Sequence, residues 1–172
     1  MKVFSVIGVI VGAVALQMAF ARFTVGGRWS VDLVLVAVAF IALKWGPGAG
    51  VIGGTLGGLT QDALAGGTIG VSGLAKTVVG FFVGVIGSQF VVAQPAPRML
   101  IVAGATIANR LLTQAILSGI DLNWAGLSWP AMLTETGLNA LTALVLFYSI
   151  EMGPALLRRR SSRGSGFRKR KW

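Results

Sequence analysis

Cysteine and histidine are absent from the 172-residue sequence, and only five residues are acidic. The first two absences exclude disulfides, thiolate nucleophiles, imidazole bases and the usual protein ligands of zinc, copper and haem. Among the acidic residues, Asp62 and Glu135 would have to act as a carboxylate pair in an acid–base enzyme, and nothing in their sequence positions brings them together. The sequence therefore predicts a protein without a metal, a cofactor or a catalytic residue.

Charged residues of both signs make up only 12% of the chain, whereas 55% of the residues are hydrophobic. Because so little polar surface cannot cover a soluble globule, we expect an all-α integral membrane protein. A helix needs about 20 apolar residues to cross a hydrocarbon core of roughly 30 Å. The sequence thus predicts a bundle of six transmembrane helices, at about 3–21, 29–44, 47–64, 72–92, 97–118 and 130–157, followed by a disordered basic tail at 158–172.

Positive charge gathers at the C-terminal end of the chain. Lys2 precedes the first apolar segment, which we interpret as a retained helix because no small-residue cleavage site followed by a soluble domain appears. By the positive-inside rule we expect both termini in the cytoplasm. One interpretation is that the basic tail only fixes this topology. The alternative is that it also binds an acidic cytoplasmic partner or anionic lipid, and attraction to the lipid would contribute about 1 kcal/mol per basic residue. Its basic residues are Arg158, Arg159, Arg160, Arg163, Arg168, Lys169, Arg170 and Lys171.

Glycines recur at every fourth position in the middle of the chain. Such a row leaves a helix face without side chains, so that a neighbouring backbone can pack directly against it. We expect close packing inside the bundle, and a dimerisation face is the alternative. The residues concerned are Gly46, Gly50, Gly54 and Gly58 in the third helix and Gly80 and Gly84 in the fourth.

A few ionisable and amide side chains lie within the apolar segments, where they are costly and usually have a purpose. We expect them in the outer half of the membrane, with Asp62 paired to Lys76 or to Arg110. The alternative is a pocket for a small polar ligand. The cluster, or the pocket, consists of Asp62, Lys76, Asn109, Arg110, Glu135 and Asn139.

One segment combines the glycines with the charges and carries a pattern of its own. Its residues are Gly57, Gly58, Leu59, Asp62, Gly66, Gly70, Leu74 and Gly80. The pattern resembles the signature region of the MreD family of rod shape-determining membrane proteins. The chain length, the number of helices and the short hairpin of the second and third helices are similar too.

The resemblance implies a non-enzymatic subunit of the bacterial cell-elongation machinery, located in the bacterial inner membrane. Such a protein binds the membrane anchor of the scaffold MreC. It works with the peptidoglycan polymerase RodA, the paired transpeptidase and the actin-like MreB in organising lateral peptidoglycan synthesis. The resemblance also implies a fold similar to the substrate-binding (S) components of energy-coupling-factor transporters, so that a substrate-binding transporter subunit is the alternative. Neither function involves a nucleic acid.

Overall fold

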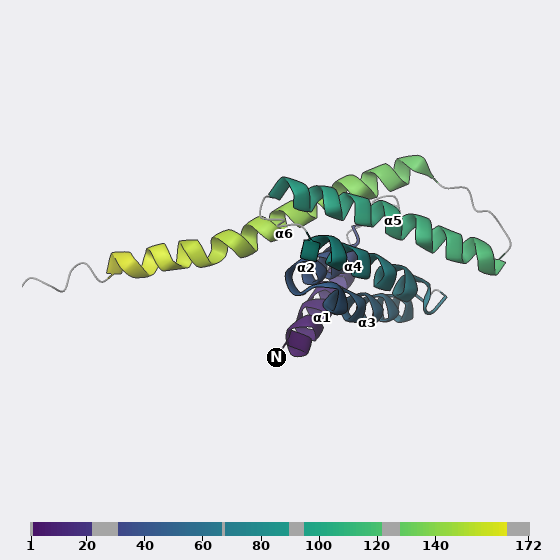
Figure 1. Ribbon diagram of the computed structural model, residues 1–172, viewed down its shortest axis with the longest axis horizontal. Coiled ribbons are helices and arrows are strands. Elements are labelled where there is room, and N and C mark those ends of the chain that lie inside the picture. The colour runs from purple at the N-terminus through teal and green to yellow at the C-terminus, as the bar shows by residue number, and fades with distance from the viewer. Residues whose placement is uncertain (1, 22–30, 67, 90–94, 122–127, 165–172) are drawn as a thin grey trace, which may run out of the picture.

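The computed structural model describes residues 2–21, 31–66, 68–89, 95–121 and 128–164, and these contain six α-helices and no strand (Figure 1). The prediction of an all-helical protein with six helices is confirmed. From residue 150 to residue 164 only the backbone is described. The helices are α1 (Lys2–Ala21), α2 (Leu33–Trp45), α3 (Pro47–Ala65), α4 (Val71–Gln89), α5 (Pro95–Asp121) and α6 (Trp129–Gly164).

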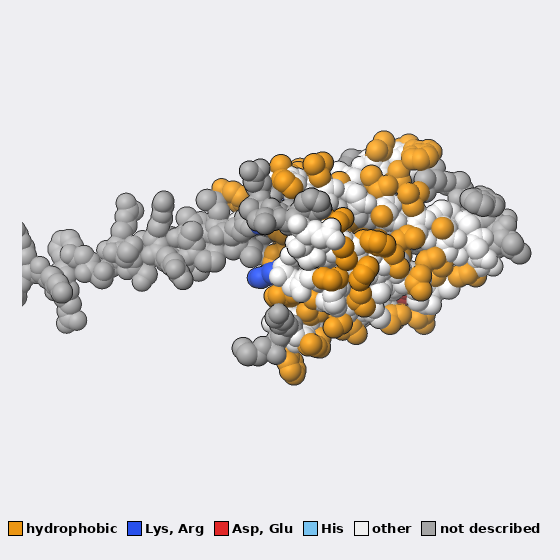
Figure 2. All heavy atoms as spheres, in the orientation of Figure 1, with side chains coloured by type: hydrophobic (Ala, Val, Ile, Leu, Met, Phe, Trp, Pro, Cys, Tyr) orange, Lys and Arg blue, Asp and Glu red, His pale blue; other side chains and the backbone are white. Residues whose placement is uncertain are grey.

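Three of the described helices contain segments long and apolar enough to cross a membrane: Val71–Gln89, Ala96–Ile120 and Trp129–Ser149. Two shorter apolar segments, Val3–Ala19 and Leu33–Trp45, accompany them. On the face shown in Figure 2, hydrophobic side chains cover much of the described surface, and acidic side chains are almost absent. A surface of this kind suits lipid rather than water, in agreement with the predicted membrane protein.

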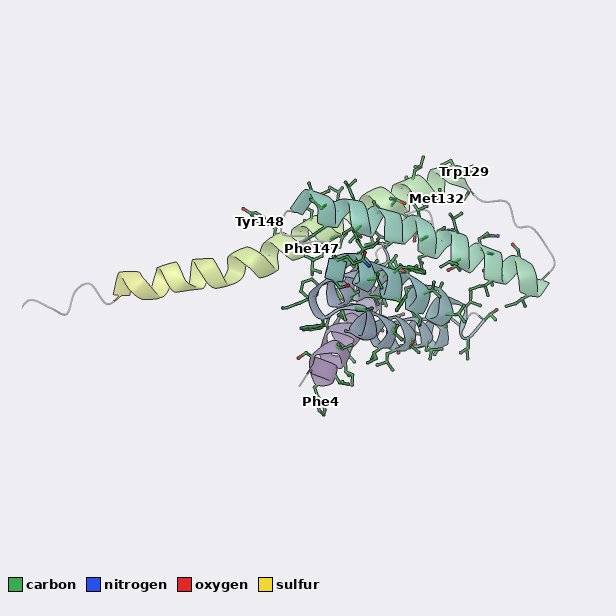
Figure 3. The ribbon with its side chains drawn as sticks, viewed as in Figure 1. Phe4, Trp129, Met132, Phe147 and Tyr148 are labelled. Atoms are coloured by element: carbon green, nitrogen blue, oxygen red, sulfur yellow. The ribbon has the colours of Figure 1, made fainter. Side chains whose placement is uncertain are left out.

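Exposed aromatic side chains lie at two positions along α6 that are separated by about the thickness of a membrane core. Trp129 and Tyr148 are both 61% exposed, and Figure 3 shows Tyr148 projecting away from the bundle. They are 19 residues apart in the sequence, or about 28 Å along a helix. That separation is close to the thickness of the hydrocarbon core, roughly 30 Å, and aromatic residues concentrate at both membrane interfaces.

Helix α2 forms the centre of the bundle. Every residue from Val34 to Ala42 is buried, and α2 contacts all five other helices. On one side its residues pack with Val6, Ile10 and Val14 of α1. On the other side, Phe40 and its neighbours pack with α4, α5 and α6, where the Phe40 and Phe147 ring centroids are 5.5 Å apart. A helix surrounded in this way needs apolar residues on every face, which explains its unbroken apolar sequence.

The start of α2 differs from the expected position near residue 29. Residues 29 and 30 lie outside the described residues, and residues 31 and 32 precede the helix. Asp32 is the N-cap, and its side chain accepts a hydrogen bond from the Leu35 N–H. A carboxylate at this position satisfies a backbone donor that has no partner within the helix, and this sets the first helical residue at Leu33.

Gly46 both ends α2 and begins α3. Its φ of 87° lies in the left-handed region, which glycine adopts without strain. Its N–H donates to the Ala42 carbonyl at 2.9 Å. Pro47 follows at the first helical position of α3, where a proline loses no hydrogen bond. The two helices therefore form a tight hairpin. A Cβ added at Gly46 would meet no atom within 4 Å, so this glycine serves the turn rather than helix packing.

The last helix is longer than expected. The tail was predicted to be disordered from residue 158, but α6 continues to Gly164, and residues 165–172 lie outside the described part of the chain. Alanine, leucine and arginine after residue 154 are good helix formers. Extending an existing helix also avoids the cost of nucleation, which explains why the first half of the tail continues α6.

Candidate functional site

The backbones of α3 and α4 touch along the glycine ridges. A Cβ on Gly50 would collide with the carbonyl of Gly80, and one on Gly54 with the carbonyl of Lys76. At the end of α4, a Cβ on Gly84 would collide with the backbone of Pro47. Only glycine permits this approach, since any side chain would have to displace a backbone. The contact fixes how far α4 extends along α3, and hence the position of Lys76.

Lys76 forms an ion pair with Asp32 inside the bundle. Its Nζ lies 2.7 Å from Asp32 Oδ2, and the two side chains are 2% and 10% exposed. The other carboxylate oxygen, Oδ1, accepts the N–H of Leu35 at 2.9 Å. Asp32 thus caps α2 and binds α4 at the same time. A buried charge is tolerated when it is paired and hydrogen-bonded, and both oxygens of this carboxylate have a partner.

Asn139 of α6 joins the same group through its side-chain amide. Its Oδ1 accepts the backbone N–H of Asp32 at 2.9 Å, and its Nδ2 donates to Thr106 Oγ1 of α5 at 3.2 Å. Asn139 is fully buried, and Thr106 is buried too. The polar cluster, defined as Asp32, Lys76, Thr106 and Asn139, therefore connects α2, α4, α5 and α6 in the interior.

A second pair lies one helical turn from this polar cluster. Arg110 Nη1 is 3.6 Å from Glu135 Oε2, with Glu135 buried and Arg110 partly exposed. Glu135 is also within electrostatic range of Asp32 and Lys76. Asn109, beside Arg110, is buried, and its Oδ1 has no hydrogen-bond partner in the described structure. The structure thus brings together Lys76, Arg110, Glu135 and Asn139 of the expected set. Asn109 and Asp62 make no hydrogen bond or ion pair with them in the described structure.

Asp62 makes neither of the expected pairs, with Lys76 or with Arg110. Its Oδ2 instead accepts three backbone N–H groups at the start of α4, from Gly70 at 2.9 Å, Ser72 at 3.0 Å and Gly73 at 3.3 Å. The prediction was wrong because the first N–H groups of a helix lack intrahelical partners and attract a carboxylate. Asp62, in the last turn of α3, lies next to them.

The MreD-like sequence pattern corresponds to the hairpin of α3 and α4. Gly66 has a φ of 66° and Gly70 a φ of 103°, so both adopt left-handed conformations in the connection. Gly58 faces the Gly73 backbone, where a Cβ would come within 2.5 Å of Gly73 Cα. The leucines of the pattern, Leu59 and Leu74, are exposed on the outside of the bundle. The glycines and Asp62 of the pattern therefore build this hairpin, and they do not line the polar cluster.

Sequence reasoning missed two members of the polar cluster, Asp32 and Thr106. Asp32 had a usable signal, because an aspartate directly before an apolar segment is a typical N-cap. Thr106 had a weaker signal, because a polar residue in an apolar helix is expected to face protein or water rather than lipid, but a threonine there often only donates to the carbonyl four residues earlier. It does so here, with Val102 O at 2.9 Å.

Together, the apolar helices and the interior ion pairs define a helical membrane protein whose polar groups hold its own helices together. The family model of the rod shape-determining protein MreD matches residues 1–152. The chain therefore belongs to the MreD family, whose members are non-enzymatic membrane proteins that determine cell shape. No curated protein and no solved structure matches the chain.

Proposed function

We propose that this protein is the membrane subunit of the cell-elongation machinery that binds the transmembrane anchor of the scaffold MreC and so helps to organise lateral peptidoglycan synthesis. The match of the family model over residues 1–152 carries the proposal. RodA with its paired transpeptidase and MreB are the further partners within the same complex. We also propose that the fold is similar to that of the S components of energy-coupling-factor transporters.

The buried polar residues support a packing role over small-molecule binding. Both carboxylate oxygens of Asp32 are engaged within the chain, and so are both polar atoms of the Asn139 side chain. Asp62 likewise binds the start of α4. Groups engaged in this way hold helices in register, whereas a ligand site needs polar atoms that face an open space.

Co-purification tests the proposal. The full chain is extracted from membranes in mild detergent, together with intact MreC or with MreC whose transmembrane anchor is replaced by an unrelated helix. We expect recovery of intact MreC and loss of recovery when the anchor is replaced. Equal recovery of both forms would refute binding through the anchor, and recovery of a transporter ATPase instead would favour the substrate-binding alternative.

The proposed topology has six crossings, with both termini in the cytoplasm of a bacterium. Because the natural sequence has no cysteine, single cysteines at positions 67 and 123 can report on the outer side without a background signal. A membrane-impermeant thiol reagent added to intact cells should label both positions and leave a cysteine in the tail unlabelled. Labelling of the tail alone would show that the true topology is the reverse of the proposed one. On the cytoplasmic side, the basic residues from Arg158 to Lys171 would contact anionic lipid or an acidic partner.

A further inference from the structure

Arg110 lies at a depth where a charged side chain is unfavourable. In the apolar segment Ala96–Ile120 of α5 it is ten residues from Ile120, or about 15 Å along the helix axis. Its partner Glu135 is six residues after the exposed Trp129 of α6, or about 9 Å. Both measures place Arg110 inside a hydrocarbon core of roughly 30 Å. Long side chains reach an interface from near a helix end, and Arg110 lies far from both ends of α5.

The Arg110 side chain is nevertheless 42% exposed, whereas the Glu135, Asp32 and Lys76 side chains are at most 10% exposed. Its guanidinium has five N–H donors. In the described structure its one ion-pair contact, to Glu135, is 3.6 Å long, which exceeds the length of a normal hydrogen bond. A lipid tail at this depth offers no acceptor for the exposed guanidinium donors.

The total charge of the ionisable side chains around Arg110 restricts which kind of group can pack over its guanidinium. Two acidic and two basic side chains, Asp32 and Glu135 with Lys76 and Arg110, sum to zero charge. A further carboxylate would add an unpaired negative charge in the membrane interior. A neutral acceptor, in contrast, satisfies the guanidinium donors without changing the charge. An asparagine or glutamine side chain offers its carbonyl oxygen as such an acceptor and carries no charge.

We propose that a transmembrane helix of a partner protein packs over Arg110 on α5 and places the amide of an asparagine or glutamine against the guanidinium. The inference rests on the proposed function, in which the chain binds a partner's membrane anchor, and it specifies the chemistry of that contact. Amide side chains hydrogen-bond between helices in membranes, where a lipid tail cannot compete.

A designed peptide tests this contact without the natural partner. Three leucine–alanine transmembrane peptides of about 23 residues differ at one position, at the membrane depth of Arg110. The first carries leucine there, the second asparagine and the third aspartate. Each bears an acceptor dye. The purified full chain, with a donor dye on one introduced cysteine, is reconstituted in phosphatidylcholine vesicles, and energy transfer measures binding. We expect the asparagine peptide to bind about five- to tenfold more tightly than the leucine peptide.

The Arg110→Met variant should bind the leucine and asparagine peptides equally. Because this variant leaves Glu135 without its ion pair and can fold poorly, the double variant Arg110→Met/Glu135→Gln removes both charges and should give the same loss. Lys44→Met is the matched control, since it removes an exposed cation from the far end of α2, and it should keep the asparagine preference.

Equal binding of the asparagine and leucine peptides to the natural chain would overturn the proposal, as would a preference that persists in both Arg110 variants. Tighter binding of the aspartate peptide than of the asparagine peptide would overturn the choice of a neutral acceptor. Since no MreC is present, these outcomes are independent of the co-purification test. If MreC fails to co-purify while the asparagine preference holds, only the proposed function is refuted. If MreC co-purifies but the preference is absent, only the proposed contact at Arg110 is refuted.

Discussion

Replacing Lys76 with methionine is expected to destabilise the bundle by about 3 kcal/mol, because it leaves a buried carboxylate without its counter-ion. The Lys76 and Asp32 side chains are 2.7 Å apart, and neither is open to solvent. Methionine has a similar length and no charge, so the helix contacts of residue 76 are kept while the ion pair is lost.

The structure limits this effect. Asp32 Oδ1 keeps the hydrogen bond from the Leu35 N–H, so one of its two oxygens stays satisfied. Interhelical hydrogen bonds in membranes contribute only about 0.6 kcal/mol on average, so a loss near 3 kcal/mol would identify a charge effect.

The double variant Asp32→Asn/Lys76→Met separates the lost charge pair from lost packing. Asparagine keeps an acceptor for the Leu35 N–H, and no unpaired charge remains. We therefore expect the double variant to lose about 1 kcal/mol, less than either single variant. Such non-additivity is typical of side chains in direct contact.

Unfolding of the purified chain by increasing sodium dodecyl sulfate in mixed micelles, followed by circular dichroism, measures these differences. Lys44→Met is the matched control. Lys44 is exposed and lies over the rings of Phe40 and Trp45, at 5.4 and 5.5 Å from their centroids, so its loss should cost less than about 1 kcal/mol. The reasoning is refuted if Lys76→Met is no worse than this control, or if the Asp32 and Lys76 effects simply add.

Two further predictions use the same unfolding assay. Gly54→Ala should destabilise the chain by about 2 kcal/mol, because the new methyl group collides with the backbone of α4. Gly104→Ala, its control in open space, should be neutral or stabilise by up to about 1 kcal/mol, and equal effects of the two would contradict the close approach of α3 and α4. Asp62→Ala should cost about 1–2 kcal/mol through the lost cap of α4. Asp62→Asn, which keeps an acceptor, should cost less than half as much, and a cost equal to that of alanine would show that charge rather than hydrogen bonding stabilises this helix start.

Local sequence patterns were sufficient to predict the helices. The unbroken apolar segment before Lys44 predicted a transmembrane helix. The sequence Trp45-Gly46-Pro47-Gly48 is typical of a break after it, since proline lacks an amide donor and glycine tolerates turn conformations. The continuation of α6 past residue 157 was missed, because its charged and small residues suggested disorder while their helix propensity went unused.

What the sequence by itself determined is therefore the class of protein, the six helices and the glycine ridge with its potential for close packing. These depend on composition and on residue spacing along one helix. Only the tertiary structure decided which charges meet. Lys76 pairs with Asp32, 44 positions away in the sequence, and Asp62 binds the backbone of α4. Partners on different helices are set by how far each helix extends along its neighbours. That is fixed by many weak contacts at once, such as those of Gly50 and Gly54 with α4, and by no single stretch of sequence.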